Sequence, residues 1–321
     1  MKQNQQIMIT GGAGFIGSHL TERLLSEGFR VTVIDDFSTG NPQNLAAVAN
    51  NPRLKVIKSK VSSCANLAEL VSECSAVFHL AAAVGVELVL REPIDTLRTN
   101  LDETEAILSA ACPARVPVLV TSTSEVYGKS QKDEFSEDDD LLIGPPTLTR
   151  WSYACSKLMD EFLALAYWRQ RGLPVTIVRI FNTVGPRQTG RYGMVLPRFI
   201  AAAKTGKPIQ VYGDGTQTRC FCDVSDTVEA IVRLQRSPGA TGEVFNVGSD
   251  HEITLLDLAR KVREVLQSNS AIELVPYEMA YGPGFEDMRR RKPCLGKLER
   301  VTGFRPATSL ETIIRRAAGL M

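Results

Sequence analysis

The chain has 321 residues, of which 44% are hydrophobic and 23% are charged, and its formal net charge is +1. This length allows one large domain, or one domain followed by a smaller C-terminal domain, and the composition is that of an ordinary globular protein. No Lys/Arg block stands out as a nucleic-acid footprint, no apolar run reaches the roughly 18 residues of a membrane span, and the N-terminal segment lacks the pattern of a signal peptide. We therefore expect no nucleic-acid partner and no membrane contact.

The cysteines and histidines indicate neither a disulfide framework nor a metal site. The seven cysteines are odd in number and scattered, which is typical of reduced thiols in a cytosolic enzyme, so we expect a cytoplasmic protein. The spacing of Cys220 and Cys222 suits a strand better than a metal clamp. Because the three histidines, His19, His79 and His251, have no ligand spacing, we expect no structural metal.

The first half of the chain alternates short β-branched apolar runs with longer amphipathic stretches. The apolar runs predict strands at residues 6–10, 30–35, 54–58, 76–80, 117–122 and 174–180. The amphipathic stretches predict helices at residues 14–26, 67–74, 93–111 and 152–171. Strands that alternate with helices imply a parallel sheet covered on both faces, so we expect an α/β protein with a doubly wound sheet of the Rossmann type.

The pattern loosens after about Phe181. Short strands are predicted at residues 209–212, 243–247 and 272–275, and helices at 227–236, 255–267 and 310–318. Thr254 and Asp257 have capping-box spacing at the start of one of these helices. We expect residues 1–181 to form the first domain and residues 182–321 a smaller α/β substrate lobe, with some segments returning to the first domain.

The segment from Ile7 to Gly17 is a strand, a glycine-rich turn and a helix start. Gly11 permits the tight turn, Gly14 lets the backbone approach a pyrophosphate, and Gly17 allows close contact between helix and strand. The helix N-terminus offers N–H groups to the phosphate, and Asp35 at the end of the next strand can bind the ribose hydroxyls and repel a 2′-phosphate. This spacing predicts NAD rather than NADP, the alternative being a plain glycine turn in another α/β protein.

Tyr153 and Lys157 are four residues apart on a predicted helix, so their side chains share one face. A tyrosine normally ionises near pH ~10, and a neighbouring ammonium together with a positive nicotinamide favours the phenolate. The phenolate can take a proton from a hydroxyl while the adjacent carbon gives a hydride to NAD. Such a pair is also common on surface helices. A catalytic role is favoured because the hydroxyl-rich segment 121–128 ends a predicted parallel strand, where ligands bind.

With these motifs on hand, the chain resembles the extended short-chain dehydrogenase/reductase family that acts on nucleotide sugars. The resemblance covers nearly the whole length of the chain. Within that family, the chain is most similar to the UDP-glucuronate decarboxylases. Besides the glycine motif, it rests on residues 79–82 (HLAA), 99–100 (TN), 122–128 (STSEVYG), 153–157 (YACSK), 179–182 (RIFN), 185–187 (GPR) and 211–219 (VYGDGTQTR). The chain departs from the pattern at Lys60 and Cys294, where relatives often carry acids, and across residues 188–196.

The resemblance implies roles for individual residues. Thr123, Ser124 and Glu125 are implied to face the sugar beside Tyr153. The residues implied to bind NAD, besides Gly11, Gly14, Gly17, Asp35, Tyr153 and Lys157, are Phe15, Ile16, Leu80, Ala81, Ala82 and Asn100. The residues implied to bind the UDP-sugar substrate are Asn182, Arg187, Arg191, Tyr212, Arg219 and an arginine of the 289–291 run, for which we choose Arg290. Planar guanidinium groups suit phosphate oxygens, although a solvated basic loop is the alternative for the run.

Reactions of this family begin with hydride loss from C4, which gives a 4-keto sugar. A C6 carboxylate is then β to the ketone, so carbon dioxide can leave, and we expect a UDP-glucuronate decarboxylase that yields UDP-xylose. A 4-epimerase acting on UDP-glucose or UDP-glucuronate and a 4,6-dehydratase remain open. Many dehydratases carry Asp-Glu where Ser124 and Glu125 stand, but GDP-mannose dehydratases also show Thr-Ser-Glu. An NAD-binding regulatory protein on the same fold is the non-enzymatic alternative.

The helices predicted at residues 93–111 and 152–171 carry apolar side chains on more than one face. Those of the second helix and its start are Trp151, Phe162, Leu165, Tyr167 and Trp168. Relatives commonly pair these two helices into a dimeric four-helix bundle, so the resemblance implies a homodimer. Burial of these side chains within one monomer is the alternative.

Overall fold

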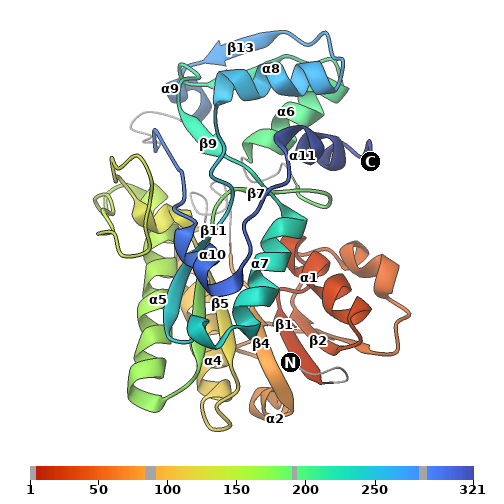
Figure 1. The fold of residues 1–321 in the computed structure, drawn as a ribbon, viewed down its shortest axis with the longest axis vertical. Helices are drawn as coiled ribbons and strands as arrows, with labels where there is room; N and C mark the ends of the chain where they lie inside the picture. Colours follow the sequence, from red (N-terminus) through yellow and green to blue (C-terminus); the bar gives the residue numbers. More distant parts are fainter. Residues whose placement is uncertain (1–4, 84–91, 190–193, 282–287) are drawn as a thin grey trace.

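The computed structural model describes residues 5–83, 92–189, 194–281 and 288–321. Its centre is a seven-stranded parallel sheet with the strand order β11-β6-β5-β4-β1-β2-β3 (Figure 1). The strands are β1 (Gln6–Thr10), β2 (Arg30–Asp35), β3 (Leu54–Lys58), β4 (Cys74–His79), β5 (Val118–Thr123), β6 (Val175–Ile180) and β11 (Glu243–Val247). The order runs outward from β1 in both directions, which is the doubly wound arrangement of a Rossmann fold. The expected fold class is confirmed.

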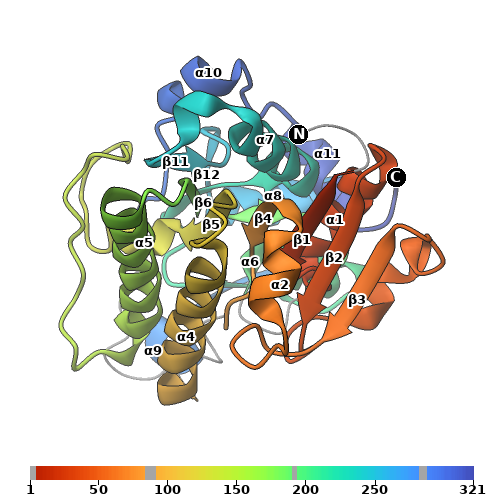
Figure 2. The same cartoon turned by 90° about the horizontal axis from the view of Figure 1, so that it is seen from below.

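Helices cover both faces of this sheet (Figure 2). Alternate residues of β1 point to opposite faces, so Ile7 packs in one apolar core and Met8 in the other. The first core contains side chains of α1 (Phe15–Ser26), α7 (Val224–Arg236) and α10 (Gly296–Thr302). The second core contains side chains of α2 (Leu67–Ser72), α4 (Pro93–Ala111) and α5 (Ser152–Arg171). Because both faces are covered, the inner strands are apolar throughout rather than alternating.

A smaller α/β group lies beyond the carboxyl ends of the sheet strands, at the top of Figure 1. Its own apolar core joins Phe199, Leu258 and Ile313 from three helices. The helices are α6 (Val195–Lys204), α8 (Leu255–Val265), α9 (Tyr277–Tyr281) and α11 (Leu310–Ala317). Its short strands pair in twos, namely β7 (Thr183–Val184) with β10 (Cys222–Asp223), β9 (Thr218–Cys220) with β12 (Glu252–Thr254), and β8 (Ile209–Tyr212) with β13 (Ile272–Val275).

Four 3-10 helices complete the elements that matter for the site and its surroundings. They are η1 (Pro42–Val48), η2 (Ser124–Tyr127), η3 (Thr149–Trp151) and η5 (Pro238–Ala240). η2 follows β5 directly, and the Thr123 side chain caps it by accepting the N–H of Glu125 at 3.2 Å. This turn fixes the position of Glu125 at the end of the strand.

Most predicted elements lie within one or two residues of the observed ones. α7 begins at Val224, three residues before the expected start, because Asp223 caps it and accepts the N–H of Ser225 at 2.8 Å. α6 was not predicted from the sequence, since its glycine-rich and proline-containing surroundings show no helix start signal. β11 comes from beyond residue 181 and pairs with β6 along its whole length.

Candidate active site

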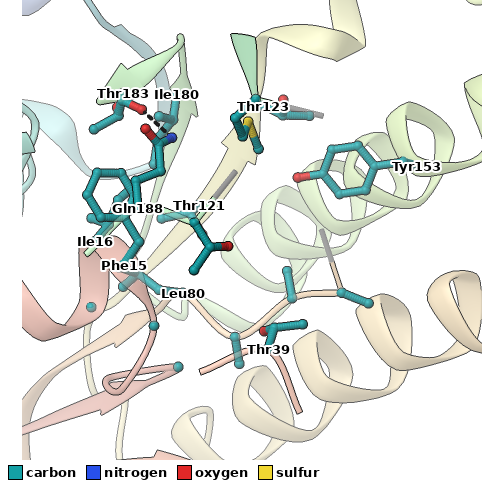
Figure 3. Close-up of a pocket in the computed structure, with 18 of the residues that line it drawn as sticks. Phe15, Ile16, Thr39, Leu80, Thr121, Thr123, Tyr153, Ile180, Thr183 and Gln188 are labelled. Atoms are coloured by element: carbon teal, nitrogen blue, oxygen red, sulfur yellow. Dashed lines mark hydrogen bonds between the residues drawn. The ribbon is translucent and has the colours of Figure 1, made fainter. Parts of the chain in front are cut away.

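A cavity of about 1090 Å³ opens at the carboxyl ends of the parallel strands. Its walls come from the turn after β1, the ends of β2, β4, β5 and β6, the start of α5 and the smaller α/β group. In Figure 3, Tyr153 lies on one side and Phe15, Ile16 and Gln188 on the other, with Thr123 between them. This edge is where parallel α/β sheets bind ligands.

The glycine turn after β1 forms the floor of the cavity. A Cβ atom at Gly17 would lie 2.1 Å from the Gly11 carbonyl oxygen, and one at Gly11 would lie 2.8 Å from the amide nitrogen of Ala81. Gly11 also has a φ of +69°, which disfavours any side chain. No side chain caps α1 at Gly14, so its first amides remain for a ligand. Because Gly14, Phe15, Ile16 and Gly17 line the cavity, an anionic diphosphate fits here.

Asp35 lines the cavity at the end of β2. Its carboxylate accepts the N–H of Ala13 at 2.8 Å and the N–H of Phe37 at 2.9 Å. Burial raises the pKa of Asp35, and these two amides oppose the rise. The two bonds fix the carboxylate and leave acceptor capacity for ribose hydroxyls. This arrangement fits NAD.

The segment after β4 brings Leu80, Ala81 and Ala82 to the cavity wall. Before it, His79 is completely buried between the hydroxyls of Thr10 at 2.8 Å and Thr104 at 3.1 Å. Burial lowers the pKa of His79 to about 3, and the Lys157 charge adds to this effect. His79 is therefore a neutral structural link rather than an acid or base.

Asn100 does not line the cavity, although the resemblance implied contact with NAD. Its side-chain oxygen accepts the N–H of Ala83 at 2.7 Å, and its amide nitrogen donates to the Ser156 hydroxyl at 2.9 Å. Asn100 thus connects the wall after β4 with α5.

Tyr153 lies at the start of α5, and its phenol hydrogen-bonds with Thr123 at the end of β5. Burial raises the pKa of the phenol above its ordinary range, and the negative charges of Glu125 and Asp160 add to the rise. The Thr123 bond and the Arg291 charge lower it. Without a ligand, the tyrosine is therefore a phenol.

Lys157 follows Tyr153 by one turn and lines the cavity. Its ammonium donates to the Asp160 carboxylate at 2.7 Å, and the two side chains are only 2% and 0% exposed. A carboxylate partner for the lysine was not anticipated from the sequence. The lysine that follows Tyr153 on α5 is therefore an ion-paired ammonium rather than an isolated charge.

Glu125 lines the cavity among arginine side chains. Arg291 donates to Glu125 at 2.5 Å and to the Ser124 hydroxyl at 2.6 Å, and Arg150 lies 3.3 Å from Glu125. Burial alone would raise the pKa of Glu125, but the charges of Arg291, Arg150 and Arg219 hold it below its ordinary value. Glu125 is therefore an ionised carboxylate at neutral pH. Ser124, unlike Thr123 and Glu125, does not line the cavity.

The smaller α/β group supplies the opposite wall of the cavity with Asn182, Tyr212 and Arg219. The Asn182 amide donates to the Cys220 carbonyl at 3.1 Å, and Arg219 donates to the Thr218 carbonyl at 2.7 Å. The ring of Tyr212 lies 3.6 Å from the Arg198 guanidinium, which stacks over it.

The remaining arginines that were expected to bind substrate lie in different places. Arg187 lines the cavity but is ion-paired with Glu22 of α1 at 2.7 Å, on the side of the glycine turn. Arg191 lies outside the described residues. Arg290 does not line the cavity, because it pairs with Asp133 and with Glu252 on the outer surface. Arg291 is the arginine of the run that reaches the site, so we transfer the expectation from Arg290 to Arg291.

Among the cavity residues that were not chosen from the sequence are Arg150, Arg198, Tyr277 and Arg291. Arg150 carries the clearest signal that was missed, since it stands three residues before Tyr153 and so reaches the same helix start. Neighbouring side chains of an extended segment point to opposite sides, so Arg290 and Arg291 could be told apart only by their partners.

The part of the chain that the structure describes contains no candidate metal site and no candidate membrane span. No group of three or more His, Cys, Asp or Glu side chains there is placed to hold a metal ion. Among the helices that the structure describes, none is both long and apolar enough to cross a membrane.

Comparisons with known proteins give consistent matches. The model of the NAD dependent epimerase/dehydratase family matches residues 7–248. UDP-N-acetyl-alpha-D-glucosaminuronate decarboxylase of Bacillus cytotoxicus is 44% identical over 308 residues, or 96% of this chain and 94% of that protein. UDP-glucuronic acid decarboxylase 6 of Arabidopsis thaliana is 35% identical over 320 residues, covering 96% of this chain and 86% of that protein.

A solved structure agrees with these matches. UDP-glucuronic acid 4-epimerase of Bacillus cereus, in complex with UDP-glucuronic acid and NAD, has a TM-score of 0.87 and 27% identity, with 98% of both chains covered. The resemblance that the motifs indicated is thereby confirmed. This chain belongs to the NAD-dependent epimerase/dehydratase family, and its cofactor is NAD.

Proposed function

We propose that this enzyme decarboxylates a UDP-linked uronate through a 4-keto sugar, with UDP-glucuronate giving UDP-xylose. The observation that carries the proposal is the placement of Glu125 with Arg291 and Arg150 beside Tyr153. Guanidinium groups match carboxylates in shape and charge, so this corner of the cavity suits a sugar that carries one. The names of the curated relatives, both decarboxylases of UDP-linked uronates, support this choice.

The cofactor would be held by Gly11, Gly14, Asp35 and the wall at Leu80 and Ala81. When bound, NAD accepts a hydride from the substrate carbon and returns it at the end of the reaction.

Tyr153 takes the proton of the C4 hydroxyl as that carbon is oxidised, and Thr123 holds the phenol in place by a hydrogen bond. The same two side chains then stand next to the ketone oxygen. Lys157 supports the phenolate from one turn further along α5.

Loss of carbon dioxide follows from the position of the ketone. The C4 ketone is β to the C6 carboxylate, so the electrons of the breaking C5–C6 bond flow onto O4 as an enolate. Hydrogen bonds from Tyr153 and Thr123 stabilise that oxyanion, and no metal is required. A proton then returns to C5 before the ketone is reduced. Glu125 fixes Arg291 in the orientation that receives the substrate carboxylate.

The charge state of Glu125 argues against a 4,6-dehydratase. Such an enzyme needs an acid for the C6 hydroxyl and a base for the C5 proton. A carboxylate whose pKa is held low by arginines is a poor acid and a weak base. A 4-epimerase of UDP-glucuronate would also bind a carboxylate, and one such enzyme has this fold. The product distinguishes the two reactions.

A second candidate substrate is UDP-N-acetylglucosaminuronate. The relative that carries this sugar in its name is 44% identical, against 35% for the plant UDP-glucuronic acid decarboxylase. The chemistry at C4, C5 and C6 is the same for both sugars, so the C2 substituent is the difference to be tested.

The test is to incubate the protein with each uronate and NAD and to measure the product by mass spectrometry and chromatography. We expect loss of one carbon dioxide from one or both sugars, with the better substrate identified by kcat/KM. An unchanged mass with altered retention would mean epimerisation, and loss of water would mean dehydration. Either result would replace the proposal, as would no reaction with either sugar.

We also propose that residues 1–181 bind NAD and that residues 182–321 form the lobe that binds the nucleotide sugar. Asn182, Tyr212 and Arg219 support this division, because they bring the second part of the chain to the cavity. The planar groups of Tyr212 and Arg198 suit a base, and Arg219 suits an anionic group. All seven cysteines are free, which suits the reducing cytoplasm where we place the enzyme.

The assembly that we propose is a homodimer formed by α4 and α5. These helices lie side by side and pack against each other (Figure 2), and both carry exposed apolar side chains. Of these, Ile94 is 66%, Met159 53% and Phe162 63% exposed. An apolar face that runs over two adjacent helices is most simply covered by the same face of a second copy. Side chains that were expected there but pack within the monomer are Trp151, Leu165, Tyr167 and Trp168.

A further inference from the structure

Asp160 is a buried acid of α5 that the mechanism above does not use. Tyr153, Lys157 and Asp160 are spaced by four and three residues, so they follow one face of the helix. The Asp160 carboxylate is completely buried and holds the Lys157 ammonium at 2.7 Å. Asp160 does not line the cavity, whereas Lys157 and Tyr153 do. Any effect of Asp160 on the chemistry must therefore act through those two side chains.

One oxygen of this carboxylate is poorly satisfied. Asp160 Oδ1 has no hydrogen-bond partner among the described residues, although it is buried. A buried carboxylate with an unsatisfied oxygen costs free energy of folding, and an asparagine or an apolar side chain at the same position would avoid the charge. A buried charge retained at such a cost next to a reactive group is a candidate for a functional role.

On the basis of the proposed function, we propose that Asp160 is a positioning residue that holds Lys157 in place and offsets its charge at Tyr153. An ammonium paired with a carboxylate is a weaker source of positive potential than an isolated one. Asp160 thus keeps the phenol from becoming too acidic. The pKa of Tyr153 agrees with this role, since Asp160 is one of the charges that raise it.

The reaction cycle gives this role a purpose. In the first step the O4–H bond breaks and its proton goes to the Tyr153 oxygen, while the C4 hydrogen leaves as hydride to NAD. In the last step the hydride returns to C4 and the Tyr153 oxygen gives its proton back to O4, so the cycle is balanced. A phenol that is too acidic has a weakly basic phenolate, which would accept the first proton poorly. Asp160 therefore favours the first step, in which the Tyr153 oxygen takes the proton of O4–H.

The charged groups that surround this face come from two other elements of the fold and from the segment that contains Arg291. Those facing Tyr153 or Lys157 are Glu125 of η2, Arg291 and His79 of β4. The pKa of Glu125 is lowered and that of His79 is lowered to about 3, so neither changes its charge near neutral pH. The Tyr153 phenol is thus the group on this face whose ionisation should control the acid limb of turnover.

The first test is the pH profile of kcat for Asp160→Asn, which removes the charge at constant size. We expect the acid limb to move to lower pH by about one unit, because a neighbouring like charge has been removed from the phenol. We also expect the first oxidation at C4, followed as NADH formation in a single turnover, to be slower than in wild type. Asp160→Glu keeps the charge and should retain the wild-type profile. Glu264→Gln removes an exposed carboxylate of α8 and is the matched control. An unmoved acid limb, or one that moves to higher pH, would overturn the proposal.

The second test needs no substrate, so it separates this proposal from the proposed function. The Tm values of Asp160→Asn, Lys157→Met and the double variant form a cycle. Each single change should lower Tm by roughly 5–10 °C, because it leaves a buried partner unpaired, and the double change should cost clearly less than the sum. Additive losses would refute the pairing even if the enzyme proves to be a decarboxylase. Coupled losses in a protein that converts no uronate would sink the proposed function alone.

Discussion

Tyr153 must accept and return a proton, yet burial and two carboxylates raise its pKa above the ordinary range. The site therefore depends on hydrogen bonding and charge to make the phenolate accessible, and the Thr123 hydroxyl and the Arg291 charge lower the pKa of the phenol. Residue by residue, the cavity contains an ionised Glu125 and a tyrosine that rests as the phenol.

Tyr153→Phe removes the hydroxyl and leaves the ring. We expect turnover to fall by roughly 10²–10⁴-fold, because the proton of the C4 hydroxyl loses its acceptor. NAD affinity, measured by calorimetry, should stay near the wild-type value. Tyr167→Phe, which removes a hydroxyl that donates to Glu105 near the other end of the same helix, is the matched control. Near-normal turnover of the Tyr153 variant would refute the role that we assign to it.

Asp35→Ala removes the carboxylate at the end of β2. We expect the ratio of kcat/KM with NADP to that with NAD to rise roughly tenfold or more, since repulsion between charges near a protein surface amounts to a few kcal/mol. The Ala13 and Phe37 amides donate to different oxygens of Asp35, and Asp35→Asn keeps one of these acceptors, so it should shift the ratio in the same direction with less loss of stability than Asp35→Ala. An unaltered ratio in both variants would contradict contact with the ribose.

Glu125→Gln removes the partner charge of Arg291 and Arg150. We expect the step after oxidation to slow by roughly 10–100-fold, the effect of losing a hydrogen bond to a charged group. The 4-keto sugar should then accumulate, which rapid quenching and mass spectrometry would detect. A product rate equal to that of wild type would count against the role of Glu125.

The sequence predicted residue types better than residue positions. The Tyr153 and Lys157 pair and the Gly11 to Gly17 turn were predicted because their function fixes short spacings along one element. Arg291 was confused with Arg290, since the choice depends on which side of an extended segment faces the cavity. The Lys157 and Asp160 pair was not anticipated, because spacing alone does not show that both side chains are buried.

At the scale of elements, the turn between β1 and α1 leaves no room for side chains. A Cβ atom added at Gly17 would lie 2.1 Å from the carbonyl oxygen of Gly11, and the first turn of α1 has no side-chain cap. The helix is thereby brought close to the strand with its amides directed at the ligand edge of the sheet. The sequence predicted this element well, whereas α6 escaped prediction because its packing partners α8 and α11 are distant in the chain.

Gly17→Ala tests this element. The added methyl group requires the turn to shift, so we expect the free energy of unfolding to fall by roughly 1–3 kcal/mol and NAD affinity to fall roughly tenfold or more. Urea denaturation and calorimetry measure the two effects. Gly239→Ala is the matched control, because its Cβ would approach only Val301, at 3.8 Å. Equal behaviour of the two variants would show that the turn tolerates a side chain.

For the whole molecule, the outer face of α4 and α5 is the feature that the monomer does not explain. Phe162 is 63% exposed in the middle of α5, and Ile94 and Leu97 are exposed on α4. Water contact with these side chains is unfavourable by roughly 1.5–3 kcal/mol for each one that a partner would bury completely. In a symmetric dimer each of these side chains would be buried once in each of the two subunits.

Phe162→Glu places a charge at the centre of this face. We expect wild-type protein to be a dimer by light scattering and the variant to be a monomer at the same concentration, because burying unpaired carboxylates is costly. Met279→Glu, which changes an 80% exposed side chain of α9, should leave the dimer intact. A wild-type protein found only as a monomer would reject the interface.

The pairing of β11 with β6 also bears on how the protein is made. The outermost strand of the sheet is Glu243–Val247, so β6 has no neighbour on that side until this later segment has emerged from the ribosome. A nascent chain that ends before residue 243 displays a bare strand edge, a template for association with other chains. Translation stalled before residue 243 should therefore produce aggregates or recruit chaperones. Once residues 243–247 have emerged, β11 pairs with β6 and covers this edge.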